Sequence, residues 1–382
     1  AELKAIAGGT SGAITLSNAG VALSGDATDL KTIFDENITT HTGQVTVTDA
    51  LYTVAELKAI AGGTSGAITL NNTARALSGD ATDLKTIFDE NITTHTGQVT
   101  VTDSAYTVAE LKSIAGGTSG AITLNSTGVA LSGDATDLKT IFDENITAHT
   151  GQVTVTDSAY TVAELKAIAG GTSGAITLSD TTVALTGSVT DLNTIFGENI
   201  TTHTGTVTIN NTAVYDIDKL KVINAGTTGA ITLNDTTIAL SGDATDLASA
   251  LDGSINHGGA VTVTDALYTV AELKAIAGGT SGFITLNNTA RALSGDATDL
   301  KTIFDENITA HTGQVTVTDA SYTVAELKAI AGGTSGAITL NNTGVALSGD
   351  ATDLKTIFDE SIRSEEHTSE LQSPMYLVCR LL

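Results

Sequence analysis

The sequence predicts an α/β solenoid, a fold in which each coil consists of a strand, a helix and a return segment and stacks on the next coil. Three observations lead to this fold class. The segment AELKAIAGG begins at Ala1 and recurs, with small changes, about every 54 residues, and such periodicity is typical of solenoids. Each repeat also contains β-branched runs that suit strands and two segments in which apolar residues have helical spacing. The later copies begin at Ala55, Ala109, Ala163, Asp218, Ala271 and Ala325.

The first half of the repeat that spans residues 44–97 predicts a strand followed by a helix. Val45–Thr48 alternates apolar and hydroxyl side chains, the pattern of a half-buried strand. Thr53 and Glu56 have the spacing of a capping box, in which each side chain accepts a hydrogen bond from a free backbone amide at the start of a helix. Within residues 54–60, Val, Leu and Ile fall on one helix face.

The second half of the same repeat follows the same plan. Ala67–Leu70 predicts a strand, and Arg75–Leu77 is a candidate for a second, shorter extended segment. Asp80 is placed to cap a helix over residues 81–88, which carries Ala, Leu, Ile and Phe on one face. Residues 91–97 then turn the chain back toward the next strand.

These elements give two strand–helix coils of about 27 residues in each repeat, close to the size of the coils in leucine-rich repeats. Strands joined by helices are expected to run parallel, with right-handed crossovers. Seven copies of each helix type predict about fourteen coils and, at about 4.8 Å per strand, a sheet roughly 65 Å long. The alternative is an all-β solenoid in which the AELK and TDLK segments are loops, but the capping box and the helical spacing favour the α/β form.

Glycines follow the first helix of each repeat, as in Ala61–Gly66 (AGGTSG). Gly62 and Gly63 are expected to end the helix in the left-handed conformation that glycine adopts at little cost. A phosphate-binding loop would connect a strand to the N-terminus of a helix. Here the glycines follow a helix and precede a strand, so the segment is predicted to be a helix C-cap and not a phosphate site.

Residues 1–362 are predicted to form a single solenoid of seven repeats of about 54 residues. Because both ends of this region fall within a repeat, we expect the chain to be a piece of a longer protein. Residues 363–382 break the pattern. They contain the only Pro, Cys and Met of the chain, and Arg363–Ser373 (RSEEHTSELQS) and Leu377–Leu382 (LVCRLL) resemble the translation of a short-read sequencing adapter. The resemblance implies that this tail is not native and does not pack on the last coil.

The composition excludes several classes of partner. The chain has 43 Asp and Glu against 17 Lys and Arg, a net charge of −26, and this field repels the phosphate backbone of nucleic acids and anionic lipid. No apolar run approaches the roughly 20 residues of a membrane span, so no membrane insertion is expected. Residues 1–362 contain no Cys, which leaves neither a disulfide framework nor a thiolate metal site.

Histidines recur with the repeat in a way that suggests a metal-binding series: His41, His95, His149, His203, His257 and His311. Two coils separate successive copies, which places them about 10 Å apart along the stack. Zinc–nitrogen bonds are about 2 Å long, so two ligands of one ion must lie far closer than that. We therefore predict that each histidine forms hydrogen bonds with the backbone in the return segment, and that the repeats hold no metal and no cofactor.

Paired acids precede the second helix of the repeat, at Asp80 and Asp83 and in copies at Asp134, Asp137, Asp296 and Asp299. An acid in the first helical turn caps free amides and complements the helix dipole, so capping is the predicted role. The alternative is calcium, which takes six to eight oxygen ligands. Neither an EF-hand loop nor the motif of calcium-binding β-rolls is present. Asp89 and Glu90 would add ligands to such a site, so this alternative stays open.

Alternation along the strands also predicts a polar face on the sheet. If the two valines of Val45–Thr48 point inward, Thr46 and Thr48 point outward, and the next coil adds Thr69 and Asn71. The result is a regular hydroxyl and amide array, which resembles the flat Thr-x-Thr surfaces of ice-binding β-solenoids. Coils of an α/β solenoid curve, however, and threonine also suits any solvated strand.

The repeats contain no arrangement typical of an enzyme active site, and the chain is predicted not to be an enzyme. Glycoside hydrolysis needs two acids about 5–10 Å apart at one place, whereas the acids here recur at the repeat period. Acidic, cysteine-free repeats rich in Thr, Gly and Ala resemble the long arrays of giant secreted or cell-surface, adhesin-like proteins of bacteria. The resemblance covers residues 1–362 and implies a structural or adhesive stalk or spacer outside the cell, in contact with cell-surface or extracellular matrix components. Binding of calcium, a glycan or ice by the same array is the alternative.

Overall fold

The computed structural model of the chain describes residues 1–35, 38–89, 91–143, 146–197, 199–200, 202–253, 255–305, 308–359 and 362. These residues contain fourteen helices and eighteen short strands, and every strand pairing is parallel. The predicted fold class, an α/β repeat solenoid, is confirmed. The AELK and TDLK segments are helical, which excludes the all-β alternative. The tail of residues 363–382 lies outside the described residues.

The helices belong to two classes that alternate along the chain. The AELK class consists of α1 (Glu2–Ala7), α3 (Val54–Gly63), α5 (Val108–Gly117), α7 (Val162–Gly171), α9 (Ile217–Gly226), α11 (Val270–Gly279) and α13 (Val324–Gly333). The TDLK class consists of α2 (Ala27–Asp35), α4 (Ala81–Asp89), α6 (Ala135–Asp143), α8 (Val189–Gly197), α10 (Ala244–Leu251), α12 (Ala297–Asp305) and α14 (Ala351–Asp359).

The start of helix α3 shows why the AELK segment is helical. The Glu56 amide donates to Thr53 Oγ1 at 3.3 Å, and the Thr53 amide donates to Glu56 Oε2 at 2.9 Å. The predicted capping box is therefore confirmed, and it recurs at α5, α7, α11 and α13. Behind it, Leu57 and Ile60 turn into the core with almost no exposed surface, as the apolar spacing predicts.

The end of helix α3 differs from the prediction. Gly62 and Gly63 both lie inside the helix, which stops at Thr64 with an extended backbone, φ −137°. The prediction that these glycines end the helix in a left-handed conformation was wrong, because Gly253 is the only glycine with positive φ in the described chain. Gly63 has a different role: a Cβ there would lie 2.4 Å from the Phe34 ring, so glycine lets the two coils approach.

Each repeat contributes three strands of three residues. They are β1 (Leu23–Gly25), β2 (Val45–Val47), β3 (Ile68–Leu70), β4 (Leu77–Gly79), β5 (Val99–Val101), β6 (Ile122–Leu124), β7 (Leu131–Gly133), β8 (Val153–Val155), β9 (Ile176–Leu178), β10 (Leu185–Gly187), β11 (Val207–Ile209), β12 (Ile231–Leu233), β13 (Leu240–Gly242), β14 (Val261–Val263), β15 (Ile284–Leu286), β16 (Leu293–Gly295), β17 (Val315–Val317) and β18 (Ile338–Leu340).

In the described residues the strands form six separate three-stranded sheets, and each sheet consists of three strands that follow one another in the chain. Strand β3 pairs with β2, and only its first residue continues the pairing, through a single bridge to Ile92. The predicted extended segment near Arg75 is strand β4, which starts a new sheet by pairing with β5. The prediction of one continuous sheet was therefore wrong: the chain turns at residues 71–76, and β4 then pairs with β5 in a new sheet and not with β3.

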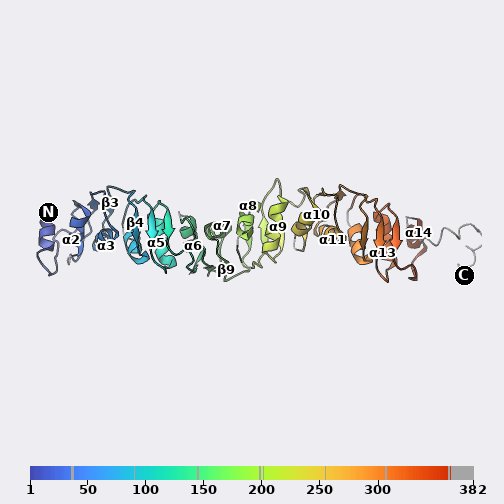
Figure 1. The fold of residues 1–382 in the computed structure, drawn as a ribbon, viewed down its shortest axis with the longest axis horizontal. Coiled ribbons are helices and arrows are strands. Elements are labelled where there is room, and N and C mark those ends of the chain that lie inside the picture. The colour runs from blue at the N-terminus through green and yellow to red at the C-terminus, as the bar shows by residue number, and fades with distance from the viewer. Residues whose placement is uncertain are drawn as a thin grey trace, which may run out of the picture. The chain divides into compact units, whose positions relative to one another are not determined.

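Two compact units make up the chain. Of the described residues, unit 1 contains those of Ala1–Val183 and Gly197–His203, and unit 2 contains those of Ala184–Phe196 and those from Thr204 onward. Within unit 1, each helix from α1 to α7 packs against the next, in chain order, and within unit 2 the same holds from α9 to α14 (Figure 1). The prediction that residues 1–362 form a single solenoid stays a prediction.

The core of each repeat lies between the helices and the strands. Around strand β5 it contains Leu84 of α4, Ile114 of α5 and both valines of β5, none of which has exposed surface. The hydroxyl residue between the valines, Thr100, faces outward and is partly exposed. Helices and strands therefore place two kinds of polar group at fixed positions: those of the return segments, and those on the outer face of the strands.

Candidate functional site

The histidines of the return segments are buried, each exposed by 2% or less. His95 Nε2 lies 2.9 Å from the carbonyl oxygen of Arg75, and His95 Nδ1 lies 2.8 Å from Thr118 Oγ1. Because a carbonyl oxygen can only accept, Nε2 carries the proton and Nδ1 accepts from the threonine hydroxyl. The same hydroxyl oxygen accepts the amide of Gly120 at 3.0 Å. One histidine thus links three segments of the chain that are distant in sequence.

This arrangement recurs in the other repeats. Nδ1–Oγ1 distances of 2.8–3.0 Å join His41 to Thr64, His149 to Thr172, His257 to Thr280 and His311 to Thr334. Backbone carbonyls accept from Nε2 at 2.7–2.9 Å in all of these and in His203. The prediction of backbone hydrogen bonds is confirmed. Sequence reasoning missed the threonine, because it lies 23 residues away on the next coil.

Burial changes the acid–base behaviour of these side chains. It lowers the pKa of His95, His149, His203, His257 and His311 below the usual value of about 6.5, because an imidazolium would lose its hydration. The hydrogen bond to the backbone carbonyl opposes this effect only in part. These histidines are therefore neutral at pH 7, with no surface from which they could exchange protons with a substrate.

The acids before the second helix act as caps. Asp80 Oδ1 accepts the amide of Asp83 at 2.9 Å, as predicted. A further cap, which the sequence did not reveal, comes from the next coil, where Asp103 Oδ2 accepts the amide of Ala81 at 2.6 Å. Asp83 and Asp89 form ion pairs with lysines. Glu90 lies outside the described residues.

Ion pairs between neighbouring helices also recur with the repeat. A lysine of one helix reaches an aspartate of the following helix in the pairs Lys4–Asp29, Lys58–Asp83, Lys112–Asp137, Lys221–Asp246, Lys274–Asp299 and Lys328–Asp353. Of the acids proposed as calcium ligands, those that the structure describes already have partners: Asp80 accepts a backbone amide, and Asp83 and Asp89 pair with lysines. In the described part of the chain, no three His, Cys, Asp or Glu side chains gather into a group that could hold a metal ion.

The outer face of each sheet carries a row of hydroxyl groups in register. In the sheet of β4, β5 and β6, Ser78 lies opposite Thr100, which lies opposite Thr123, and Gln98 donates to Thr123 Oγ1 at 3.0 Å. The prediction that such residues face outward is confirmed. Each row is three residues long, because each sheet has three strands.

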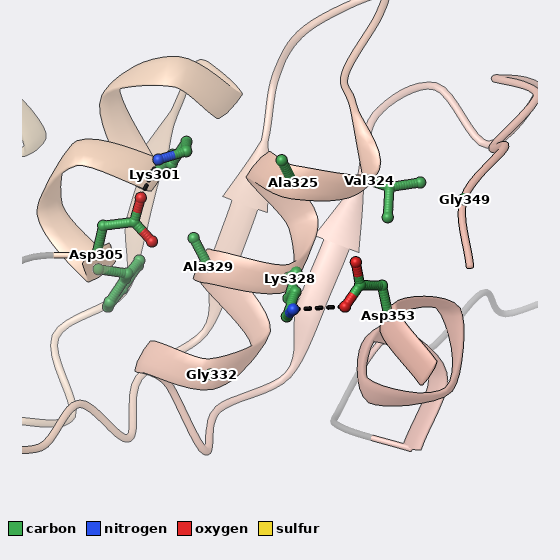
Figure 2. Close-up of a pocket in the computed structure, with 10 residues that line it drawn as sticks. Lys301, Asp305, Val324, Ala325, Lys328, Ala329, Gly332, Gly349 and Asp353 are labelled. Atoms are coloured by element: carbon green, nitrogen blue, oxygen red, sulfur yellow. Dashed lines mark hydrogen bonds and ion pairs between the residues drawn. The ribbon is translucent and has the colours of Figure 1, made fainter. Parts of the chain in front are cut away.

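Shallow grooves cross the helical face. In unit 2, a groove of about 730 Å³ runs over α13 between α12 and α14. Figure 2 shows its small floor residues Ala325, Ala329 and Gly332 between two ion pairs, Lys301–Asp305 on one side and Lys328–Asp353 on the other. A groove of about 500 Å³ has the same arrangement over α5 in unit 1. The four charged groups around the first groove are paired with one another.

Each polar cluster thus recurs with the repeat, and the members described above already bind one another, so the arrangement can hold coils together. Within the described residues, none of the helices combines the length and the apolar character that a membrane crossing requires. The chain matches no protein-family model and no curated protein.

Proposed function

We propose that the chain is a structural repeat region, a stalk or spacer of a large extracellular bacterial protein, and that it is not an enzyme. One observation carries the proposal: in repeat after repeat, polar side chains of one coil bond to the next coil. The links join His95 to Thr118, Lys58 to Asp83 and Asp103 to the amide of Ala81. The repeat therefore uses its polar chemistry for its own cohesion.

A chain built in this way can vary in length without changing its fold. These hydrogen bonds and ion pairs join residues that are 22 to 25 positions apart in the sequence, which is about the length of one coil. Stability in such arrays is approximately a sum of repeat and nearest-neighbour contributions. Repeats can then be added or removed while those left keep their partners, which is what a spacer requires.

The acidic surface suits a protein that stays separate from its neighbours. A net charge of −26 opposes association with other acidic surfaces and favours solubility. The proposed partners are cell-surface or extracellular matrix components at the ends of the complete protein. The hydroxyl rows stop after three strands, so a single sheet offers no extended lattice, and this favours the spacer over ice binding by the same face.

The test is to lengthen the chain. One, two or three further copies of residues 44–97 are inserted after Gly97, where the junction reproduces the natural sequence. A spacer predicts that small-angle X-ray scattering gives a maximum dimension that rises by a constant step, on the order of 10 Å per added repeat. The melting temperature should not fall, because each new coil brings its own partners.

A flexible insert of equal length serves as the control. A Gly/Ser segment behaves as a random coil, whose average end-to-end distance grows with the square root of its length. Such inserts therefore do not increase the maximum dimension by a constant step. If added repeats produce compaction, or the same irregular growth as the Gly/Ser insert, the spacer proposal is wrong.

A further inference from the structure

The histidine clusters have a consequence that goes beyond a spacer. Histidine is the side chain whose ordinary pKa lies nearest to neutral pH, yet six copies are buried at equivalent positions. A neutral side chain such as glutamine could donate and accept hydrogen bonds at this position without this sensitivity. The position of the histidine therefore couples the packing of the return segment to the protonation of its ring.

The surroundings of His95 show what a second proton would meet. Nδ1–H would face Thr118 Oγ1, which already accepts the amide of Gly120. The hydroxyl could still donate to the carbonyl oxygens of Gly97 or His95, at 3.2 and 3.4 Å. The hydrogen bonds can thus rearrange, so the cost of protonation is chiefly that of a charge held away from water.

No opposite charge offsets that cost among the described residues. From α4, the Phe88 ring meets His95 at a centroid distance of 5.4 Å. From the end of α5 comes Thr118, and from the preceding coil comes the carbonyl of Arg75. Burial and the backbone carbonyl are the causes that act on this ring.

We propose that the buried histidines make the array acid-sensitive, so that coils which hold together at neutral pH come apart as the pH falls from about 6.5 toward 5. The inference does not depend on the spacer role, since it concerns only how the repeats hold together. The buried histidines with a lowered pKa lie in both units, with His95, His149 and His203 in unit 1 and His257 and His311 in unit 2.

The direction of the effect follows from linkage. A histidine with a lowered pKa in the folded state contributes stability that is complete above the unfolded pKa, about 6.5, and is lost as the pH falls toward the folded pKa. In that window the unfolded chain binds more protons than the folded chain. Each such histidine raises the equilibrium constant for unfolding by up to about tenfold per pH unit.

Another effect of acid has the opposite sign, which makes the test decisive. The chain carries a net charge of −26, and adding protons relieves its self-repulsion, which by itself stabilises the compact state. If self-repulsion dominated, mild acid would strengthen the fold. The histidine clusters predict that mild acid weakens it.

The experiment measures unfolding of the full chain in urea at fixed ionic strength between about pH 8 and pH 5.5, above the range where carboxylates titrate. We expect the urea midpoint to fall steadily below about pH 6.5. Calorimetry in two buffers of different ionisation heat gives the protons taken up on unfolding. We expect more than one proton at about pH 6. A midpoint that is constant or rises toward acid would overturn the proposal, as would an uptake near zero.

Substitutions identify the groups that titrate. Glutamine can donate and accept as the neutral ring does, but it carries no charge, so His→Gln at His95, His149, His203, His257 and His311 together should remove most of the pH dependence. Should that variant fail to fold, the single change His95→Gln should lower the proton uptake by up to one. His367→Gln is the matched control, because His367 belongs to no repeat, and it should leave the profile unchanged. A buried-site variant that keeps the full pH dependence contradicts the proposal.

Discussion

Single residues decide how closely neighbouring coils approach. A Cβ at Gly117 would lie 2.4 Å from the Phe88 ring, and a Cβ at Gly120 would lie 1.9 Å from the carbonyl oxygen of Gly97. A Cβ at Gly116 would meet nothing within 4 Å. Adjacent glycines of the same helix therefore differ in role: Gly117 provides space for an aromatic ring, and Gly116 faces the open groove.

This difference predicts opposite effects of the same substitution. Gly116→Ala should stabilise the chain by about 0.5–1 kcal/mol, because alanine has the higher helix propensity and the position is open. Helix α9 already has Ala225 at the equivalent place. Gly117→Ala should destabilise by about 1–3 kcal/mol, because Phe88 must move. Urea unfolding at neutral pH measures both, and a loss of stability in Gly116→Ala would show that this glycine is needed by the fold.

The distance in sequence between two contacting residues decides whether their contact could be predicted from the sequence. Thr53 and Glu56 were identified as a capping box because the motif is complete within four residues. The pairing of His95 with Thr118 spans 23 residues, and no local sequence pattern at either residue predicts the other as its partner. The histidines were correctly assigned to hydrogen bonding, but their burial was not foreseen, because it depends on how the coils stack.

At the scale of elements, strands proved harder to predict than helices. A capping box and a 3.6-residue apolar spacing define a helix locally, whereas a three-residue strand is defined by its partner. The sheet breaks after β3 because the following turn is fixed by the preceding coil: Tyr52 donates its hydroxyl to the carbonyl of Asn72, whose side chain donates to the carbonyl of Ala50 at 3.0 Å. Nothing within the turn itself indicates these bonds.

Helix α10 should be less stable than α12, a helix of the same class in unit 2. It has eight residues where α12 has nine, and Leu251 stands where α12 has Phe304. In α12 that phenylalanine meets His311 ring to ring, with centroids 5.4 Å apart, and Lys301 forms an ion pair within the helix. Residue 248, equivalent to Lys301, is alanine.

Hydrogen exchange measures this difference within one unit. Amides of Ala244–Leu251 should exchange about tenfold faster than those of Ala297–Asp305, since the smaller side chain and the missing pair lower the local opening energy by about 1–2 kcal/mol. Helix α12 is the internal control. Equal or slower exchange in α10 would mean that packing of Leu251 against Gly279, which it closely approaches, fully replaces the phenylalanine.

At the scale of the whole molecule, the net charge of −26 opposes a compact array through self-repulsion. Ion pairs such as Lys58–Asp83 offset it locally, but their side chains are 46% and 25% exposed, so each contributes little. The core and the buried histidine clusters must therefore supply most of the cohesion. Salt of any kind reduces the self-repulsion, and this general effect has to be separated from binding of a specific ion.

The effect of calcium on stability distinguishes the two roles considered for the acids, helix capping and calcium binding. If Asp80 is a cap and Asp83 and Asp89 are held by lysines, the array needs no ion. Repeated calcium sites would instead tie folding to the metal, because an ion that binds only the folded state stabilises it by about 2.7 kcal/mol per site at a hundred times its Kd.

The most direct test of the account is the melting temperature of the full chain in chelator, and then in millimolar calcium or magnesium at constant ionic strength. An array held by its own contacts is folded in chelator, and calcium raises its melting temperature by little more than magnesium does. If the chain is unfolded in chelator and calcium alone restores it, the carboxylates of Asp80, Asp83 and Asp89 are metal ligands, and the claim that the repeats are held together by their own side chains is wrong.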